Sequence, residues 1–129
     1  MLHTFNIHPE RELIVARYTG RTTIQDMKDL ALKIWADPDY SQNFDGIVDY
    51  RDSELNATPD AISEIADFFL HASEASYGRA AIIVARPLET ALNVLFAERM
   101  QRRNVLQLFT TWEAACEFIG EEDLPDSCG

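Results

Sequence analysis

Short apolar runs alternate along this chain with longer segments in which apolar residues recur every three or four positions. The run at 80–85 (AAIIVA) is the clearest of them, and Arg86-Pro87 closes it. Directly after it, helical spacing relates Leu88, Ala91, Leu92, Leu95 and Phe96. Because a run this short favours a strand and the spaced residues favour an amphipathic helix, the pair predicts a strand followed by a helix.

The same pattern over the whole chain predicts the order β-β-α-β-α-β-α-β-α. Strands are expected at residues 2–8, 12–18, 44–50, 80–85 and 104–109. The first alternates polar and apolar residues, as an edge strand does, whereas the second is continuously apolar and is expected to be covered on both sides. Their short connection predicts an antiparallel hairpin. The expected fold class is therefore α/β, with a mixed five-stranded sheet, an N-terminal hairpin followed by βαβ units, and about four helices packed on it.

Capping patterns mark where the helices are expected to start. Thr22 and Gln25 have capping-box spacing before the first helix, and Thr110 and Glu113 have it before the last. Thr58 precedes a proline, so it is predicted to cap the second helix.

Size and charge limit the class of protein. The 129 residues, 47% of them hydrophobic, fit one core, so residues 1–120 are expected to form a single domain and residues 121–129 an acidic tail that packs little. The net charge of −11 disfavours nucleic acid and anionic membranes as partners. The apolar stretches are far shorter than the ~20 residues of a membrane helix, and residues 1–8 do not resemble a signal peptide.

Chemical motifs are sparse. The five glycines form neither GxGxxG nor a phosphate loop, and the histidines do not cluster, so we expect no cofactor, no metal and no catalytic residue. Cys116 and Cys128 form no CxxC pair, which favours a reducing compartment and hence the cytoplasm. Cys116 is expected to be buried on a helix.

Four segments carry a family resemblance: 13–20 (LIVARYTG), 47–52 (IVDYRD), 79–88 (RAAIIVARPL) and 105–115 with its Trp112. With this element order, the chain resembles the small bacterial STAS-like proteins related to anti-sigma-factor antagonists, which share their architecture with CRAL-TRIO lipid-transfer domains. The resemblance implies a regulatory role or a lipid-like ligand. The antagonists carry a phosphorylated serine in an Asp-Ser-Ser-Gly segment. The matching position here is Thr58, in 56–59 (NATP), so that serine, its aspartate and the glycine are absent.

Several polar residues are candidates for a binding site. Asp49 and Asp52, with Asp45, are expected near the carboxyl end of a parallel strand, where open α/β sheets bind ligands, although no DxD pattern supports a magnesium enzyme. Arg51 and Arg86 follow strands at the same edge. They either converge on a carboxylate or phosphate, or pair with Asp49 and Asp52, and we favour internal pairing because buried charges are usually paired.

Two further features have an ordinary and a functional interpretation. Thr58 is either a simple N-cap, which we favour, or a phosphorylation site at a helix N-terminus. Arg99, Arg102 and Arg103 either complement a helix dipole, which we favour, or form a docking patch for an acidic partner.

Three functions are compatible with these observations. The leading hypothesis is a non-enzymatic regulatory or protein-interaction module, acting through the surface around residues 52–60. The alternative is a carrier of a small apolar or lipid-like ligand, held between the sheet and the helices of Phe68, Phe69, Leu92 and Phe96. The third is an enzyme that uses Asp49 or Asp52. A homodimer through an edge strand is a further expectation.

Overall fold

The computed structural model describes residues 3–75, 78–101 and 105–126. Its strands are β1 (His3–His8), β2 (Leu13–Thr22), β3 (Asp45–Leu55), β4 (Ala80–Ile83) and β5 (Leu106–Phe109). Its helices are α1 (Ile24–Ala36), α2 (Pro59–His71), α3 (Pro87–Met100) and α4 (Trp112–Ile119), and a short 3-10 turn spans Pro9–Arg11. None of the helices in the described part of the chain is long and apolar enough to cross a membrane.

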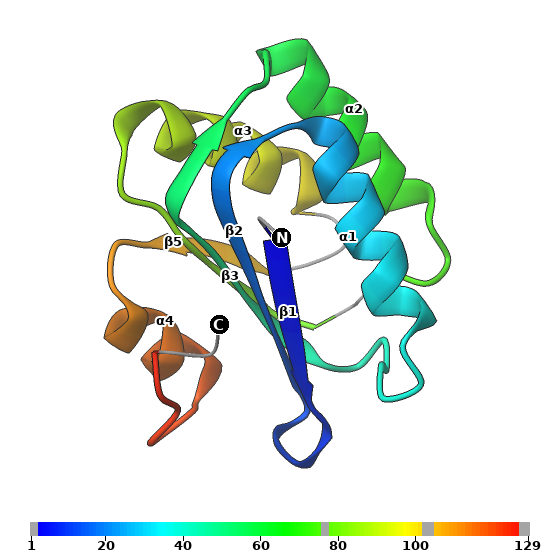
Figure 1. The fold of residues 1–129 in the computed structure, drawn as a ribbon, viewed down its shortest axis with the longest axis vertical. Helices are drawn as coiled ribbons and strands as arrows, with labels where there is room; N and C mark the ends of the chain where they lie inside the picture. The colour runs from blue at the N-terminus through cyan, green and yellow to red at the C-terminus, as the bar shows by residue number, and fades with distance from the viewer. Residues whose placement is uncertain (1–2, 76–77, 102–104, 127–129) are drawn as a thin grey trace.

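The strands form one mixed sheet in the order β1-β2-β3-β4-β5 (Figure 1). β1 and β2 are the predicted antiparallel hairpin, and the other neighbouring strands are parallel. β1 lies at the edge of the sheet, as its alternating sequence predicts. The predicted α/β class with a mixed five-stranded sheet is confirmed.

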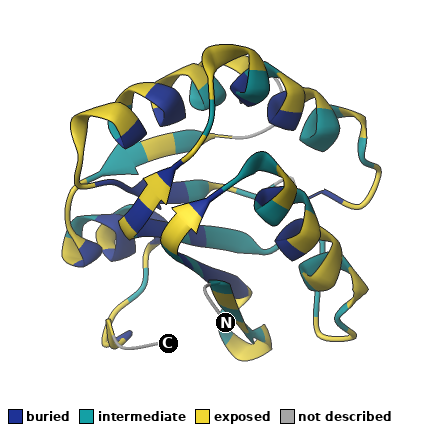
Figure 2. Ribbon diagram, turned by 45° about the horizontal axis from the view of Figure 1, so that its top comes forward, coloured by how far each residue is buried: buried dark blue, intermediate teal, exposed yellow. Residues whose placement is uncertain are grey.

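The sheet separates two cores because alternate residues of each strand point to opposite faces. Helices α1, α2 and α3 cover one face, and α4 covers the other (Figure 1). In β2, Ala16 and Tyr18 face the three-helix side, whereas Leu13 and Val15 pack with α4. Figure 2 shows the helices turning their buried sides toward the sheet and their exposed sides to solvent.

The two central strands are longer than predicted. β2 and β3 stay paired from Leu13 opposite Asp45 to Thr22 opposite Leu55, with one irregularity between Arg17 and Thr19. The buried hydroxyls of Thr22 and Ser53 lie 2.6 Å apart and hydrogen bond to each other across this extension. Thr22 therefore ends β2 and does not cap α1.

The caps of two helices accordingly differ from the prediction by one residue. Thr23 caps α1, and its capping-box partner is Asp26. Thr111, and not Thr110, caps α4. Thr58 caps α2 as predicted, since its hydroxyl accepts from the Ala61 amide at 3.2 Å.

Helix α3 is rotated relative to the predicted amphipathic face. Leu88 is 56% exposed and Leu95 38%, whereas Glu89 and Asn93 are buried beside Leu92. The cause is a polar contact, because the Glu89 carboxylate accepts a hydrogen bond from the Leu55 amide at 3.0 Å. That amide ends β3, and a buried amide without a partner is costly. The predicted apolar face is therefore confirmed for Leu92 and Phe96 and wrong for Leu88, Ala91 and Leu95, which are exposed.

The prediction that the C-terminal tail packs little is also wrong for residues 121–126. The Trp112 indole donates a hydrogen bond to the Leu124 carbonyl at 2.9 Å, and the Leu124 side chain is buried. Arg11 pairs with Glu121 at 2.8 Å. Cys116 is buried on α4, as predicted, while Cys128, Arg102 and Arg103 lie outside the described residues.

Candidate functional site

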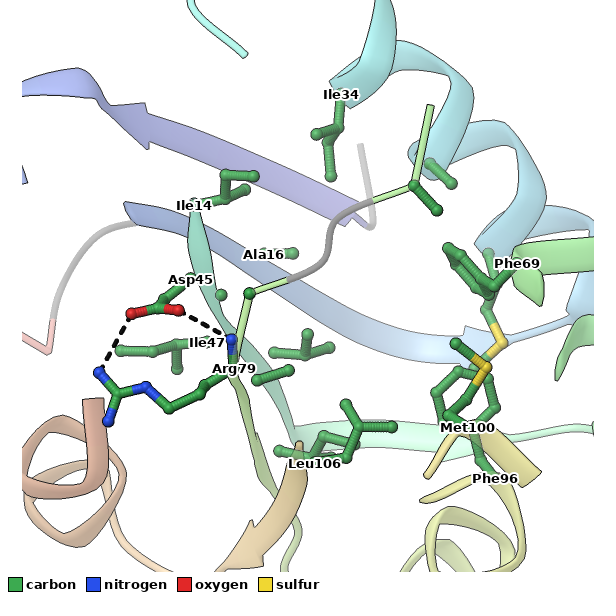
Figure 3. Close-up of a pocket in the computed structure, with 18 of the residues that line it drawn as sticks. Ile14, Ala16, Ile34, Asp45, Ile47, Phe69, Arg79, Phe96, Met100 and Leu106 are labelled. Atoms are coloured by element: carbon green, nitrogen blue, oxygen red, sulfur yellow. Dashed lines mark hydrogen bonds and ion pairs between the residues drawn. The ribbon is translucent and has the colours of Figure 1, made fainter. Parts of the chain in front are cut away.

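A cavity of about 180 Å³ lies between the sheet and helices α1, α2 and α3 (Figure 3). Its lining is almost entirely apolar, and four of the lining residues are alanines: Ala16 of β2, Ala31 of α1, Ala75 after α2 and Ala80 of β4. Gly46 of β3 adds no side chain at all. Since protein interiors are normally packed as densely as organic crystals, small residues from four elements at one place explain the unfilled volume.

Polar groups line this cavity at a few points. The Tyr18 and Tyr50 rings stack with centroids 4.9 Å apart, and their side chains are more than nine-tenths buried. Burial raises the pKa of both phenols, so both hydroxyls keep their protons at neutral pH. Both tyrosines are among the residues that line the cavity. The cavity therefore combines apolar walls with two tyrosine side chains that stay uncharged at neutral pH.

An ion pair lies at one end of the cavity (Figure 3). The Asp45 carboxylate accepts from the Arg79 amide at 2.8 Å and from the Arg79 guanidinium at 3.2 Å. Both side chains remain partly exposed, so the cavity reaches the surface here. Gly78 precedes this pair, and a Cβ there would collide with the Phe44 carbonyl oxygen. The close backbone approach fixes Arg79 over Asp45.

A second cluster lies on the opposite face of the sheet, beside α4. The buried Asp49 carboxylate accepts from Arg51 Nε at 3.0 Å and Nη2 at 2.8 Å, and Arg17 Nη2 lies 3.1 Å away. Burial alone raises the pKa of Asp49. Hydrogen bonds from Arg51 and the charges of Arg51 and Arg17 outweigh it, so the net pKa lies below the usual range. Asp126 of the tail contacts the same two arginines.

The structure therefore separates the predicted site residues. Arg51 pairs with Asp49, as the internal-pairing interpretation holds. Arg86 neither converges with Arg51 nor pairs with Asp49 or Asp52. Its guanidinium instead pairs with the Glu54 carboxylate at 3.0 Å. Asp52 is exposed within β3 and not at its carboxyl end.

The described residues hold no group of three His, Cys, Asp or Glu side chains arranged to bind a metal ion. Thr58 is occupied in its capping role, and its hydroxyl already accepts from the helix it caps. Asp45 is the first residue of β3, far from Asp52 along the strand, and pairs with Arg79, so Asp45, Asp49 and Asp52 do not form one site.

Two parts of the site were missed in the sequence. One is Arg17, the only charge in the run 13–18, which alternation places on the same face as Leu13 and Val15. This alternation is the sequence signal that could have predicted a partly buried charge at Arg17. The other is Asp126, for which residue order alone gives no signal, because its role depends on how the tail folds back.

The mixed sheet, its strand order and the helices on both faces define a SpoIIAA-like α/β domain, the STAS-like class that the sequence resembles. The solved structure of an uncharacterized DUF3478-family protein from Shewanella loihica PV-4, described as having a SpoIIAA-like fold, is similar to this chain. The TM-score is 0.58 at 14% identity, over 91% of this chain and 93% of that chain. No protein-family model and no curated protein matches the sequence. The similarity at this identity establishes the fold.

Proposed function

We propose that this protein is a non-enzymatic binding module that holds a small apolar ligand in the cavity between the sheet and helices α1 to α3. The cavity itself is the observation that supports the proposal. An enclosed empty volume of 180 Å³ costs about 4 kcal/mol at about 24 cal/mol per Å³, which is the upper bound for this cavity because it reaches the surface beside Asp45 and Arg79. That is a large fraction of the stability of a domain this size, and a ligand that fills the space recovers much of it.

The dimensions restrict the ligand. An engineered apolar cavity of about 150 Å³ holds benzene, whereas drug-sized ligands occupy about 300 to 1,000 Å³. The cavity therefore suits a single ring or a short branched chain better than a long lipid. The two stacked tyrosine rings in the lining favour an aromatic ligand such as p-cresol.

Methyl NMR of the full chain titrated with p-cresol tests this proposal. We expect the methyl resonances of Ile65 and Met100, which line the cavity, to shift in a saturable manner. Ile83 and Ile119 belong to the core beside α4 and serve as internal controls, because their methyl resonances should not shift. Equal shifts at all four methyls, or none up to the solubility limit of p-cresol, would refute ligand binding in the cavity.

The regulatory or protein-interaction module is the second candidate. It is favoured by three exposed apolar side chains on α3, namely Leu88, Val94 and Leu95. Arg99 follows on the same helix, so the fitting partner is a protein that offers apolar side chains ringed by acids. A homodimer through the β1 edge and residence in the cytoplasm remain parts of this proposal.

Capture experiments with wild type and Leu95→Glu test the second candidate. The substitution lies at a partly exposed position, so the fold should persist, and loss of a captured acidic partner would support the surface. Capture of the same partner by both proteins would refute it.

An enzyme using Asp49 is not favoured by the geometry. A general acid needs a raised pKa, whereas two arginines hold the pKa of Asp49 below its usual range.

A further inference from the structure

The carboxylate of Asp126 rests on two arginines from neighbouring strands. Arg51 holds it in bidentate fashion, with Nη2 2.5 Å from Oδ1 and Nη1 3.1 Å from Oδ2. Arg17 Nη2 donates to the Asp126 carbonyl oxygen at 2.7 Å and lies 3.2 Å from Oδ1. Both terminal nitrogens of Arg51, Nη1 and Nη2, thus contact one carboxylate, and that carboxylate belongs to the tail and not to the sheet.

Asp49, a residue of the sheet, contacts both arginines. Asp49 is 1% exposed and binds Arg51 through Nε and Nη2. It also binds Arg17 Nη2. Because Asp49 holds the Nε–Nη2 edge of Arg51, the other edge of that guanidinium keeps a fixed direction when Asp126 leaves. In addition, the buried Arg17 Nε has no hydrogen-bond partner among the described residues, which leaves a donor available.

The charges around this site select the kind of ligand. Arg17, Arg51 and Asp49 together carry one positive charge, in a protein whose net charge is −11. Arg17, Arg51, Asp52 and Asp126 line a shallow hollow of about 340 Å³. One carboxylate neutralises the single positive charge, whereas a phosphate dianion would leave an excess negative charge next to Asp52.

We propose that Arg17 and Arg51 form a binding site for the carboxylate of a small organic acid, and that Asp126 occupies this site as a tethered competitor. The site lies on the face of the sheet opposite the apolar cavity, so it is independent of the ligand proposed there. Binding of an external carboxylate displaces Asp126 from the two guanidinium groups. A tethered group competes at an effective concentration in the millimolar range, so it masks the site against weak external acids.

Two isosteric substitutions in the full chain distinguish the effect of the Asp126 charge from that of other charges in the tail. Asp126→Asn removes the charge that contacts the arginines. Asp123→Asn makes the same change of net charge three residues away, and asparagine tolerates the left-handed backbone found there (φ 59°). Acetate is the probe, and the Arg51 Nε–Hε resonance reports its binding.

We expect Asp126→Asn to bind acetate at least tenfold more tightly than either wild type or Asp123→Asn. Equal affinities in the three proteins would refute the role of Asp126 as competitor. Tenfold tighter binding of inorganic phosphate than of acetate to Asp126→Asn would refute the carboxylate assignment.

A measurement on wild type does not depend on any variant. High acetate should shift the Arg51 Nε–Hε and Asp126 amide resonances together, while sodium chloride at equal ionic strength should not. If the two salts give the same shifts, the effect is screening and the site does not exist as proposed.

Discussion

Replacing Ala16 by isoleucine should stabilise the protein, which is the reverse of the usual effect of enlarging a buried residue. Ala16 is buried on β2 and lines the cavity. The substitution adds three carbons, and burial of each is worth about 0.8 kcal/mol, so a good fit gains about 2 kcal/mol. A β-branched side chain also suits a strand. The substitution should weaken p-cresol binding as well, because it fills the same space.

The matched control is Ala81→Ile on β4. Ala81 is fully buried on the opposite face of the sheet, in the core that contains Trp112 and Ala115, and it does not line the cavity. The same three carbons there meet a filled core, and such overpacking costs about 1 to 3 kcal/mol. Urea unfolding at constant m-value gives both changes in stability. Destabilisation of similar size by both substitutions would contradict the existence of the cavity.

Substitutions at three further positions test the contacts that orient the fold. Glu89→Ala leaves the buried Leu55 amide without its acceptor and should lower the free energy of unfolding by about 1 to 3 kcal/mol, whereas Glu89→Gln, which keeps an acceptor, should cost less; urea unfolding measures both. Trp112→Phe removes the donor to the Leu124 carbonyl, so limited proteolysis should cut the tail faster than in wild type, and an unchanged rate would contradict tail docking. The pKa of Asp49 is lower in the folded than in the unfolded chain, so its charge stabilises the fold above the unfolded pKa of about 3.9 and this stability is lost as pH falls through the folded pKa. Urea unfolding from pH 6 to pH 2 should therefore show the stability difference between wild type and Asp49→Asn shrinking toward low pH, and a constant difference would contradict the arginine pairing.

Local patterns were enough to predict most of the fold. The run at 80–85 contains β4, the alternation at 2–8 marks the edge strand, and Thr58-Pro59 marks the start of α2. Each of these signals lies within a few neighbouring residues. The fold class follows from their order.

The features that were missed depend on contacts between residues far apart in the chain. Glu89 looks like a surface residue of α3 until the Leu55 amide, 34 residues earlier, is placed beside it. Asp126 is one acid among many until the tail brings it to Arg17 and Arg51. The cavity is an unfilled volume between the sheet and three helices, so no single segment of the sequence predicts it.

A crystal of the full chain under xenon pressure tests the central claim most directly. Xenon enters dry apolar cavities and is identified by its strong scattering. The cavity predicts a xenon site lined by Ala16, Ala31 and Phe96, and its absence from crystals of Ala16→Ile. Side chains packed against one another across this region, with no xenon between them, would contradict the claim that the fold holds a ligand there.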